Sequence, residues 1–381
     1  MAVGFVSIAI TDALLTIFSV DIASAFKVPV GIVLQLSTIN NLGMFIFSLL
    51  MGALVVRFKL RPLLLAGVFF VIVSAVGNFL APNFLTMVFF FLMEGIGSVL
   101  FLVMGQTLFG NVFNQKKRAK AISFTMSAGW ATGLFGPTVV GFIAAMVGWR
   151  SNFLLWVLPW SLVGLALVFF AVPSDSNAAH ATVEKVPIGA AFKSVLKNRS
   201  ATACLAANTL AVASVQVGVF AIPFYRQVFL LPLAYAVGWV TVVAGIFVVG
   251  TLVGGRLVNR FGSKPIAVAG TFLTGVFTMI FFFIPTLWIT LIFDSLHVIS
   301  AAIALPAYAC LALAQVPKSR GTMMSLNQAM DNFGKTFAPA VGGTLLIITL
   351  GVYGSVGLML GSLSIVSAVV LFLFARDPTK T

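Results

Sequence analysis

The chain has 381 residues, of which 61% are hydrophobic and only 8% carry a charged side chain. A soluble globular protein carries roughly 25% charged residues, so an aqueous fold is excluded and lipid is the expected solvent. The formal net charge of +14 would suggest a nucleic-acid partner in a soluble protein. Here the basic residues cluster between apolar segments, so we expect no nucleic acid. Cys204 and Cys310 lie in apolar segments and give neither a disulfide framework nor metal-ligand spacing.

Twelve apolar segments follow one another along the chain. A spanning helix needs about 20 mainly apolar residues. Cutting at charges, Pro and Gly gives segments near 3–26, 31–56, 62–80, 84–109, 119–147, 152–172, 201–226, 233–257, 265–284, 287–314, 320–349 and 352–374. The first is longer than the apolar part of a cleaved signal peptide, so we interpret it as a membrane helix. The expected fold class is an all-α integral membrane protein with twelve transmembrane helices.

Lys and Arg residues concentrate in alternate loops. The loops after the second, fourth, sixth, eighth and tenth segments and the C-terminal tail hold most of them, whereas the opposite loops hold only Lys27, Arg150 and Arg226. Positively charged loops mark the cytoplasmic side. We therefore predict a plasma-membrane protein with both termini in the cytoplasm.

The longest non-membrane stretch, 173–200, separates six segments from six. It predicts an N-terminal bundle over 1–172, a cytoplasmic linker over 173–200 and a C-terminal bundle over 201–381. Residues 188–197 carry apolar side chains at helical spacing with lysines opposite. This pattern is typical of a helix that lies on the membrane surface.

A short basic stretch occurs twice. Residues 52–62 return as residues 255–265, and a constant offset of 203 positions relates Arg57 to Arg260 and Pro62 to Pro265. The fifth and eleventh segments also correspond, at an offset of 202. We interpret the pattern as an internal duplication. Two six-helix halves in parallel repeat are typical of a secondary transporter whose site lies at the interface of the halves.

These repeated residues resemble a known family. Gly52 to Leu64 resembles the loop between helices two and three of the major facilitator superfamily, whose pattern is Gly-x-Leu-x-Asp-Arg-x-Gly-Arg-Lys, and Gly255 to Lys264 resembles its second copy. Gly129-x3-Gly133-x2-Gly136-Pro137-x3-Gly141 is similar to the fifth-helix motif of its antiporters, and Trp149-Arg150-x2-Phe153 to the turn that follows in drug exporters. The resemblance implies a drug/proton antiporter with gating motifs at Gly52, Arg57, Arg61, Gly136, Pro137, Gly255 and Arg260.

The chain departs from the family pattern in three places. The acidic residue of the loop motif is Val56 in the first copy and Asn259 in the second, and Lys59 replaces the second glycine. In the family this acid helps to latch the cytoplasmic side, so we expect a weak latch or one built from other residues. The arginine of the fourth helix is Phe91 here, and the acidic Glu94 stands three residues later.

Ionisable side chains within the apolar segments are the candidate working residues. Each costs roughly 3 kcal/mol or more at the bilayer centre, so it must face a partner or a water-filled cavity. The set is Asp12, Asp21, Glu94, Asp294, His297, Asp331 and Lys335. The resemblance places the first, fourth, seventh and tenth helices around the cavity. We expect proton coupling at Glu94, Asp294, His297, Asp12 and Asp21.

Two interpretations stay open for most of these residues. Glu94 is either a proton-binding carboxylate or a Glu paired with a neighbouring helix. Asp294 and His297 are three residues apart on one helix face and suit a proton relay, or the histidine is merely hydrogen-bonded. Asp331 and Lys335, four residues apart, form a buried ion pair, or Lys335 attracts an anionic substrate or frees Asp331 as protons bind.

Uncharged polar residues complete the expected cavity. Asn40 lies in the second segment, and Asn208 and Gln216 are eight residues apart in the seventh, which puts them on one face of a continuous helix. They either line the cavity together with Asp331 and Lys335 or bond neighbouring helices.

The leading hypothesis is a proton-coupled antiporter that exports small amphipathic organic compounds by alternating access. We expect a monomer among membrane lipids, with protons and a small molecule as ligands, no cofactor and no enzymatic activity. No Gly-rich motif ending in Lys-Ser/Thr is present, which argues against ATP coupling. The alternative is an uptake symporter or uniporter for an organic anion. A non-transporting membrane sensor on the same fold is the third possibility.

Overall fold

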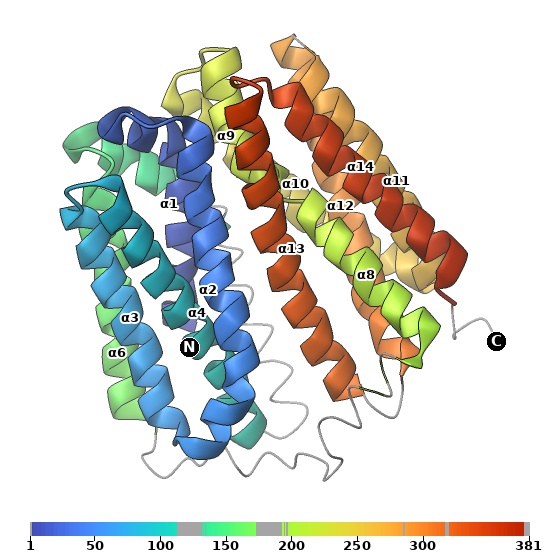
Figure 1. The fold of residues 1–381 in the computed structure, drawn as a ribbon, viewed down its shortest axis with the longest axis horizontal. Helices are drawn as coiled ribbons and strands as arrows, with labels where there is room; N and C mark the ends of the chain where they lie inside the picture. The colour runs from blue at the N-terminus through green and yellow to red at the C-terminus, as the bar shows by residue number, and fades with distance from the viewer. Residues whose placement is uncertain are drawn as a thin grey trace. The chain divides into compact units, whose positions relative to one another are not determined.

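The structure is a computed structural model that describes residues 2–112, 132–133, 135–172, 193, 195, 197–284, 286–316 and 320–376. Within these ranges every regular element is a helix (Figure 1). An apolar chain in lipid must satisfy each backbone N–H and C=O internally, and a helix does so within one segment. The predicted all-α fold class is confirmed.

The helices follow the apolar segments in order. The first part of the chain contains α1 (Ala2–Phe26), α2 (Val30–Arg57), α3 (Leu60–Leu80), α4 (Phe84–Val112), an apolar helix Phe135–Val147, the π-helical turn η1 (Phe153–Val157) and α6 (Leu158–Ala171). The second part contains α8 (Arg199–Ser214), α9 (Val217–Val228), α10 (Leu233–Phe261), α11 (Ser263–Phe283), α12 (Leu287–Gln315), α13 (Arg320–Ile348) and α14 (Tyr353–Phe374).

Ten spans in the described part of the chain are long and apolar enough to cross a membrane. They match ten of the twelve predicted segments. The predicted fifth segment is described only from residue 132 onward, where the helix Phe135–Val147 lies. The predicted eleventh segment is the helix α13, which carries Asp331 and Lys335 together with several amides and is not one of the ten spans.

The chain folds into two compact units. Unit 1 comprises Met1–Val183 and Leu230–Thr241, and unit 2 comprises Glu184–Phe229 and Val242–Thr381. The bundle bounds 1–172 and 201–381 stay predictions. Of the predicted surface helix 188–197, the structure describes only three residues. Lys193 and Lys197 are exposed and Val195 is buried in the core of unit 2. The rest of the predicted linker lies outside the described residues.

The backbone carries the duplication that the sequence predicts. Lys27 and Leu230, 203 positions apart, both have φ near 53°, a left-handed conformation that is uncommon outside glycine. Gly148 and Gly351 repeat the pattern at the same offset, with φ of 86° and 88°. The helices α4 and α12 also begin 203 positions apart. The two halves therefore share their turn geometry as well as their sequence spacing.

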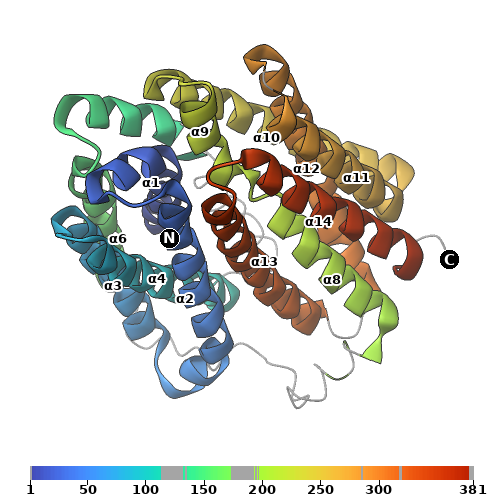
Figure 2. The same ribbon diagram turned by 45° about the horizontal axis from the view of Figure 1, so that its top comes forward.

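A buried polar network holds the helices of unit 2 together. The Thr271 hydroxyl of α11 donates to the Tyr308 oxygen of α12, which shares a 2.7 Å hydrogen bond with Ser367 of α14. The Ser367 Oγ donates in turn to the carbonyl of Ala207 in α8 at 2.6 Å. In a membrane protein lipid provides no hydrophobic drive between helices, so such bonds and close packing stabilise the bundle. Figure 2 shows these four helices grouped together.

Candidate functional site

Glu94 is the principal candidate in unit 1. It is the eleventh residue of α4 and is only 1% exposed. The side-chain amide of Asn40, from α2, donates to Glu94 Oε2, and the Ser98 hydroxyl, one turn later on α4, donates to Glu94 Oε1 at 3.2 Å. The same amide lies 3.4 Å from the carbonyl oxygen of Phe91. The structure therefore brings together Glu94, which the sequence assigned to proton coupling, and Asn40, which it assigned to the substrate cavity.

The glycine after Glu94 explains why Asn40 reaches it. A Cβ atom at Gly95 would collide with the backbone carbonyl of Asn40, so the helices α2 and α4 touch backbone to backbone at this point. Small residues at helix contacts permit such close approach in membranes. The contact places the short Asn40 side chain beside the buried carboxylate.

The structure says less about the surroundings of the two acidic residues of α1. The backbone of Asp12 lies in α1, and its side chain is outside the described residues. Asp21 is half-buried, five residues before the helix ends at Phe26. Their predicted proton-coupling role stays a prediction.

A second cluster lies in unit 2, between α9 and α12. Asp294 is 4% exposed and His297 is 3% exposed. Their side chains share a helix face as predicted, with His297 Nδ1 3.9 Å from Asp294 Oδ1. The hydroxyl of Tyr225, from α9, donates to Asp294 Oδ2 at 2.7 Å. Neither ring nitrogen of His297 has a hydrogen-bond partner among the described residues.

Sequence reasoning missed Tyr225. The chain has only four tyrosines, and this one is fully buried in a predicted membrane segment. A buried hydroxyl costs free energy unless it forms a hydrogen bond, so a tyrosine within an apolar segment is itself a signal for a polar partner. The partner on another helix could not be read from spacing.

A third polar contact joins α8 to α13. Asn208, which is 6% exposed, donates to Asp331 Oδ1. Lys335, one turn later on α13, is half-buried and acts on the Asp331 carboxylate through its charge. The Asp331 carboxylate thus has both an amide donor and a nearby positive charge, and the predicted Asp331–Lys335 ion pair stays a prediction.

The predicted face shared by Asn208 and Gln216 spans an interruption of the helix and stays a prediction. It assumed one continuous helix, but α8 ends at Ser214 and α9 begins at Val217. The chain tightens between them, since Gln216 N donates to Ala213 O and Val219 N donates to Gln216 O. The Ser214 hydroxyl bonds the carbonyl of Ala211 at 2.7 Å, a side-chain bond that competes with the helix. Gln216 lies half-buried at this break.

A profile of the Major Facilitator Superfamily matches residues 1–250 and 234–381, which together cover the whole chain. The chain belongs to the Major Facilitator Superfamily. It is an integral membrane protein and a secondary transporter of small molecules, and it is not an enzyme. Among its described residues no three His, Cys, Asp or Glu side chains gather into a group that could hold a metal ion.

Solved structures of this superfamily share the fold. A D-xylose–proton symporter has a TM-score of 0.82 at 15% identity, covering 100% of this chain and 97% of that chain. The xylose transporter XylE from E. coli, in a partially occluded inward open conformation, has a TM-score of 0.75 at 16% identity, covering 99% and 97%. The nucleoside transporter NupG has a TM-score of 0.79 at 14% identity, covering 97% of each. At such identities the likeness shows the fold alone.

One curated relative matches at the level of sequence. It is an uncharacterized MFS-type transporter, YwoD of Bacillus subtilis (strain 168), with 29% identity over 117 residues. The match covers 31% of this chain and 25% of that protein, so the aligned part spans about a quarter of the relative's length. It supports the superfamily and carries no substrate information.

The basic residues of the superfamily's loop motif make contacts inside each unit. In unit 1, Arg61 Nη2 donates to the Phe169 carbonyl at 2.6 Å, and its Cζ lies 5.0 Å from the Phe169 ring centroid. In unit 2, Lys264 Nζ donates to the Phe372 carbonyl at 3.0 Å and lies 5.9 Å from that ring. Both residue pairs are related by the offset of 203. Each cation thus tethers the first turn of α3 or α11 to the end of α6 or α14.

The other motif residues have different surroundings where the structure describes them. Arg260 is exposed and lies over the ring of its neighbour Phe261. A Cβ atom at Gly255 would meet nothing within 4 Å. Gly136 and Pro137 are both buried. Gly52 and Arg57 belong to α2, and their side-chain surroundings are outside the described residues.

Proposed function

We propose that this transporter is a proton-coupled antiporter that exports small amphipathic organic compounds by alternating access. It acts as a monomer in the plasma membrane, with both termini in the cytoplasm and with residues 1–172 and 201–381 as its two moving bundles. The observation that carries the proposal is the buried Glu94 carboxyl group and its hydrogen bonds to Asn40 and Ser98.

A carboxyl group at this position is suited to bind and release protons. Removing an ionised carboxylate from water is costly unless it is hydrogen-bonded, and the amide and hydroxyl beside Glu94 supply such bonds. Both donors are uncharged, so these two bonds do not fix the carboxyl group in its ionised form. Protonation that competes with substrate binding would let inward proton flow drive export.

The cluster in unit 2 supports the same function. Asp294 accepts a bond from Tyr225 and lies beside His297. Histidine changes its charge near neutral pH more readily than any other side chain. A carboxylate and an imidazole on adjacent turns of one helix form a short path along which a proton can pass.

Export is proposed from the fifth-helix motif. The Gly136-Pro137 pair resembles the antiporter pattern, and both residues are buried within the helix Phe135–Val147 or at its start. The drug-exporter resemblance of Trp149 and Arg150 supports an amphipathic substrate. Arg150 Nη1 donates to the carbonyl of Ala81 at 3.0 Å and lies over the Phe26 ring, so it ties together the ends of α1 and α3.

A gradient assay in proteoliposomes tests the direction of coupling. The purified full chain is reconstituted, and a fluorescent amphipathic cation such as ethidium is added outside. With a lumen more acidic than the bath, an antiporter accumulates ethidium in the lumen, and collapse of the gradient by a protonophore releases it. Accumulation only when the bath is the more acidic side contradicts antiport and indicates symport.

An uptake carrier for an organic anion is the second candidate, favoured by the half-buried Lys335. Because its neighbour Asp331 is hydrogen-bonded by Asn208, the ammonium of Lys335 can attract a substrate carboxylate. The fold is also that of a D-xylose–proton symporter. Uptake of a radiolabelled aromatic carboxylate, lost in Lys335→Ala and kept in a variant of the exposed Lys193, Lys193→Ala, supports this candidate. Equal uptake in both variants excludes Lys335 as the anion site.

A further inference from the structure

A groove of about 540 Å³ lies between α3 and α6 in unit 1. Its lining is apolar and includes Leu65, Ala66 and Phe69 of α3 and Leu162, Ala166 and Phe169 of α6. Both helices belong to spans that are apolar enough to cross the membrane. Figures 1 and 2 both show α6 beside α3. The solvent of such a groove is lipid, so its natural occupant is an acyl chain.

The corresponding helices of unit 2 explain why the groove exists. There, a Cβ atom at Gly275 of α11 would lie 2.7 Å from the carbonyl oxygen of Gly361 in α14, and the Ser364 hydroxyl donates to the Thr271 carbonyl at 2.8 Å. These contacts hold α11 and α14 close together.

In unit 1 the positions equivalent to the two glycines are Ile72 and Leu158. Their side chains prevent the backbone contact that small residues allow. A space therefore remains between α3 and α6, whereas the equivalent helices α11 and α14 are in close contact.

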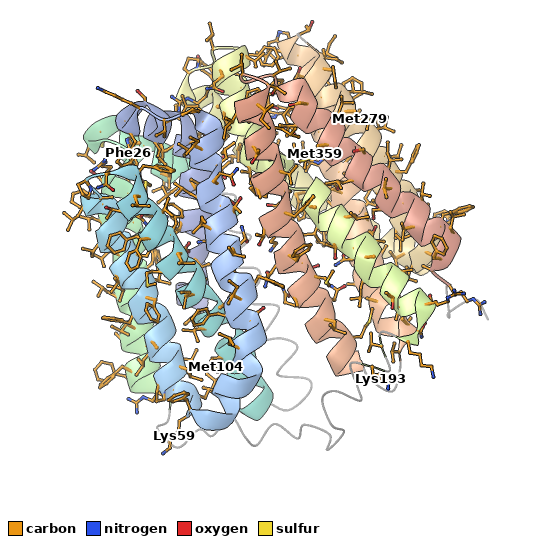
Figure 3. All side chains as sticks on the ribbon, in the orientation of Figure 1. Phe26, Lys59, Met104, Lys193, Met279 and Met359 are labelled. Carbon is orange, nitrogen blue, oxygen red and sulfur yellow. The ribbon has the colours of Figure 1, made fainter. Side chains whose placement is uncertain are left out.

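Positive charge gathers at one end of the groove. Arg61 lies one turn before Leu65 on α3 and contacts the lining residue Phe169. The hydrogen bond from Nη2 is at the exposed surface, and a guanidinium has five N–H donors, so others can reach a ligand. Lys59 is exposed at the N-cap of α3 (Figure 3). Its ammonium cannot accept hydrogen bonds and does not cap the helix, whose N-terminal dipole also favours an anion.

We propose that this groove binds an anionic glycerophospholipid, with one acyl chain between α3 and α6 and the phosphate beside Arg61 and Lys59. The apolar lining fits the chain, and the positive end fits the headgroup. Phosphate and guanidinium groups form strong charge-assisted hydrogen bonds. The site is independent of the proton and substrate residues, so its failure would leave the proposed transport function standing.

Native mass spectrometry of the full chain tests the proposal. The protein is released from detergent micelles that contain equal amounts of phosphatidylglycerol and phosphatidylcholine. The wild type should retain phosphatidylglycerol in preference to phosphatidylcholine by about fivefold or more, since a basic residue near a lipid surface contributes about that factor. Glycerol phosphate, which has no acyl chain, should not compete.

Two matched pairs of variants locate the site. Ala66→Phe fills the groove and should abolish the retained lipid, whereas Ala269→Phe at the equivalent exposed position of α11 should leave it unchanged. Lys59→Gln removes headgroup charge without disturbing the Arg61–Phe169 contact and should reduce the preference for phosphatidylglycerol. Equal retention of both lipids by the wild type, or equal lipid binding by the two phenylalanine variants, would overturn the proposal.

Discussion

Glu94 in unit 1 and His297 in unit 2 occupy the same position of the repeat, since they are 203 residues apart on helices that begin 203 residues apart. Both are nearly inaccessible, at 1% and 3% exposure. Their surroundings differ. Glu94 accepts hydrogen bonds from an amide and a hydroxyl, whereas His297 lies beside the carboxylate of Asp294.

The residues around Glu94 and His297 show that the two halves have different polar sites. The position equivalent to Asn40 is Val243, and the position equivalent to Ser98 is Ala301. Conversely, the position equivalent to Asp294 is Phe91. Buried polar groups need partners, so each titratable residue is accompanied by polar neighbours that the other half lacks. In both halves the repeat places a buried titratable residue at this position, and the neighbouring side chains differ between the halves.

The largest expected effect comes from removing the carboxyl group that we propose to bind the proton in unit 1. Glu94→Gln keeps the side-chain volume and an oxygen that accepts hydrogen bonds from Asn40, but it cannot bind and release a proton. Gradient-driven accumulation of ethidium should fall to the level of protein-free liposomes. Ser98→Ala, which removes one hydrogen bond and leaves the carboxyl group, is the control and should retain accumulation. Full accumulation in Glu94→Gln would remove Glu94 from the mechanism.

The next effect concerns the contact that supports Glu94. Gly95→Ala places a methyl group against the Asn40 carbonyl, and such overpacking costs about 1–3 kcal/mol. Thermal unfolding in detergent should occur at lower temperature. The control Gly255→Ala adds a methyl group where there is open space and gains up to about 1 kcal/mol of helix propensity. Equal unfolding temperatures for the two variants would contradict the close contact of α2 and α4.

A comparable but smaller loss is expected at the hydrogen bond in unit 2. Tyr225→Phe removes the donor to Asp294, and a typical intramolecular hydrogen bond contributes about 0.5–1.5 kcal/mol. Unfolding should again occur at lower temperature, and gradient-driven transport should weaken. Tyr235→Phe changes a tyrosine that is 71% exposed and should have no effect. A Tyr225→Phe protein with wild-type stability and transport would show that the bond is unimportant.

The smallest effects are expected at the two tethers. Arg61→Gln and Lys264→Gln each remove one cation–aromatic contact at a surface position, which contributes about 0.5–1 kcal/mol. Arg61 should cost more, because it lies closer to its ring and its carbonyl than Lys264 does. Chemical denaturation of the two variants would give the order, and a larger loss for Lys264→Gln would contradict it.

Sequence reasoning predicted the features that depend on periodicity. The lengths of the apolar segments predicted the helices, and the fixed offset predicted an internal repeat. The equal positive φ angles of Lys27 and Leu230, 203 positions apart, agree with that repeat. The spacing of Asp294 and His297 predicted a shared face, which the 3.9 Å separation confirms. These properties follow from the geometry of one helix or one turn.

Contacts between helices could not be predicted in the same way. The bonds from Asn40 to Glu94 and from Tyr225 to Asp294 depend on helix rotation and packing distance, which a single segment does not encode. The break between α8 and α9 was missed because Ser214 bonds its own helix, a local competition that apolar content conceals. Gln216 lies at this break, as the N-cap of α9.

The most direct test of the account is proton release on substrate binding. Purified protein in weakly buffered detergent solution is mixed with ethidium, and a pH dye records the released protons. If Glu94 exchanges its proton for substrate, the wild type and the Ser98→Ala control should both release protons, and Glu94→Gln should release none. Release from Glu94→Gln equal to that of the wild type would contradict the central claim.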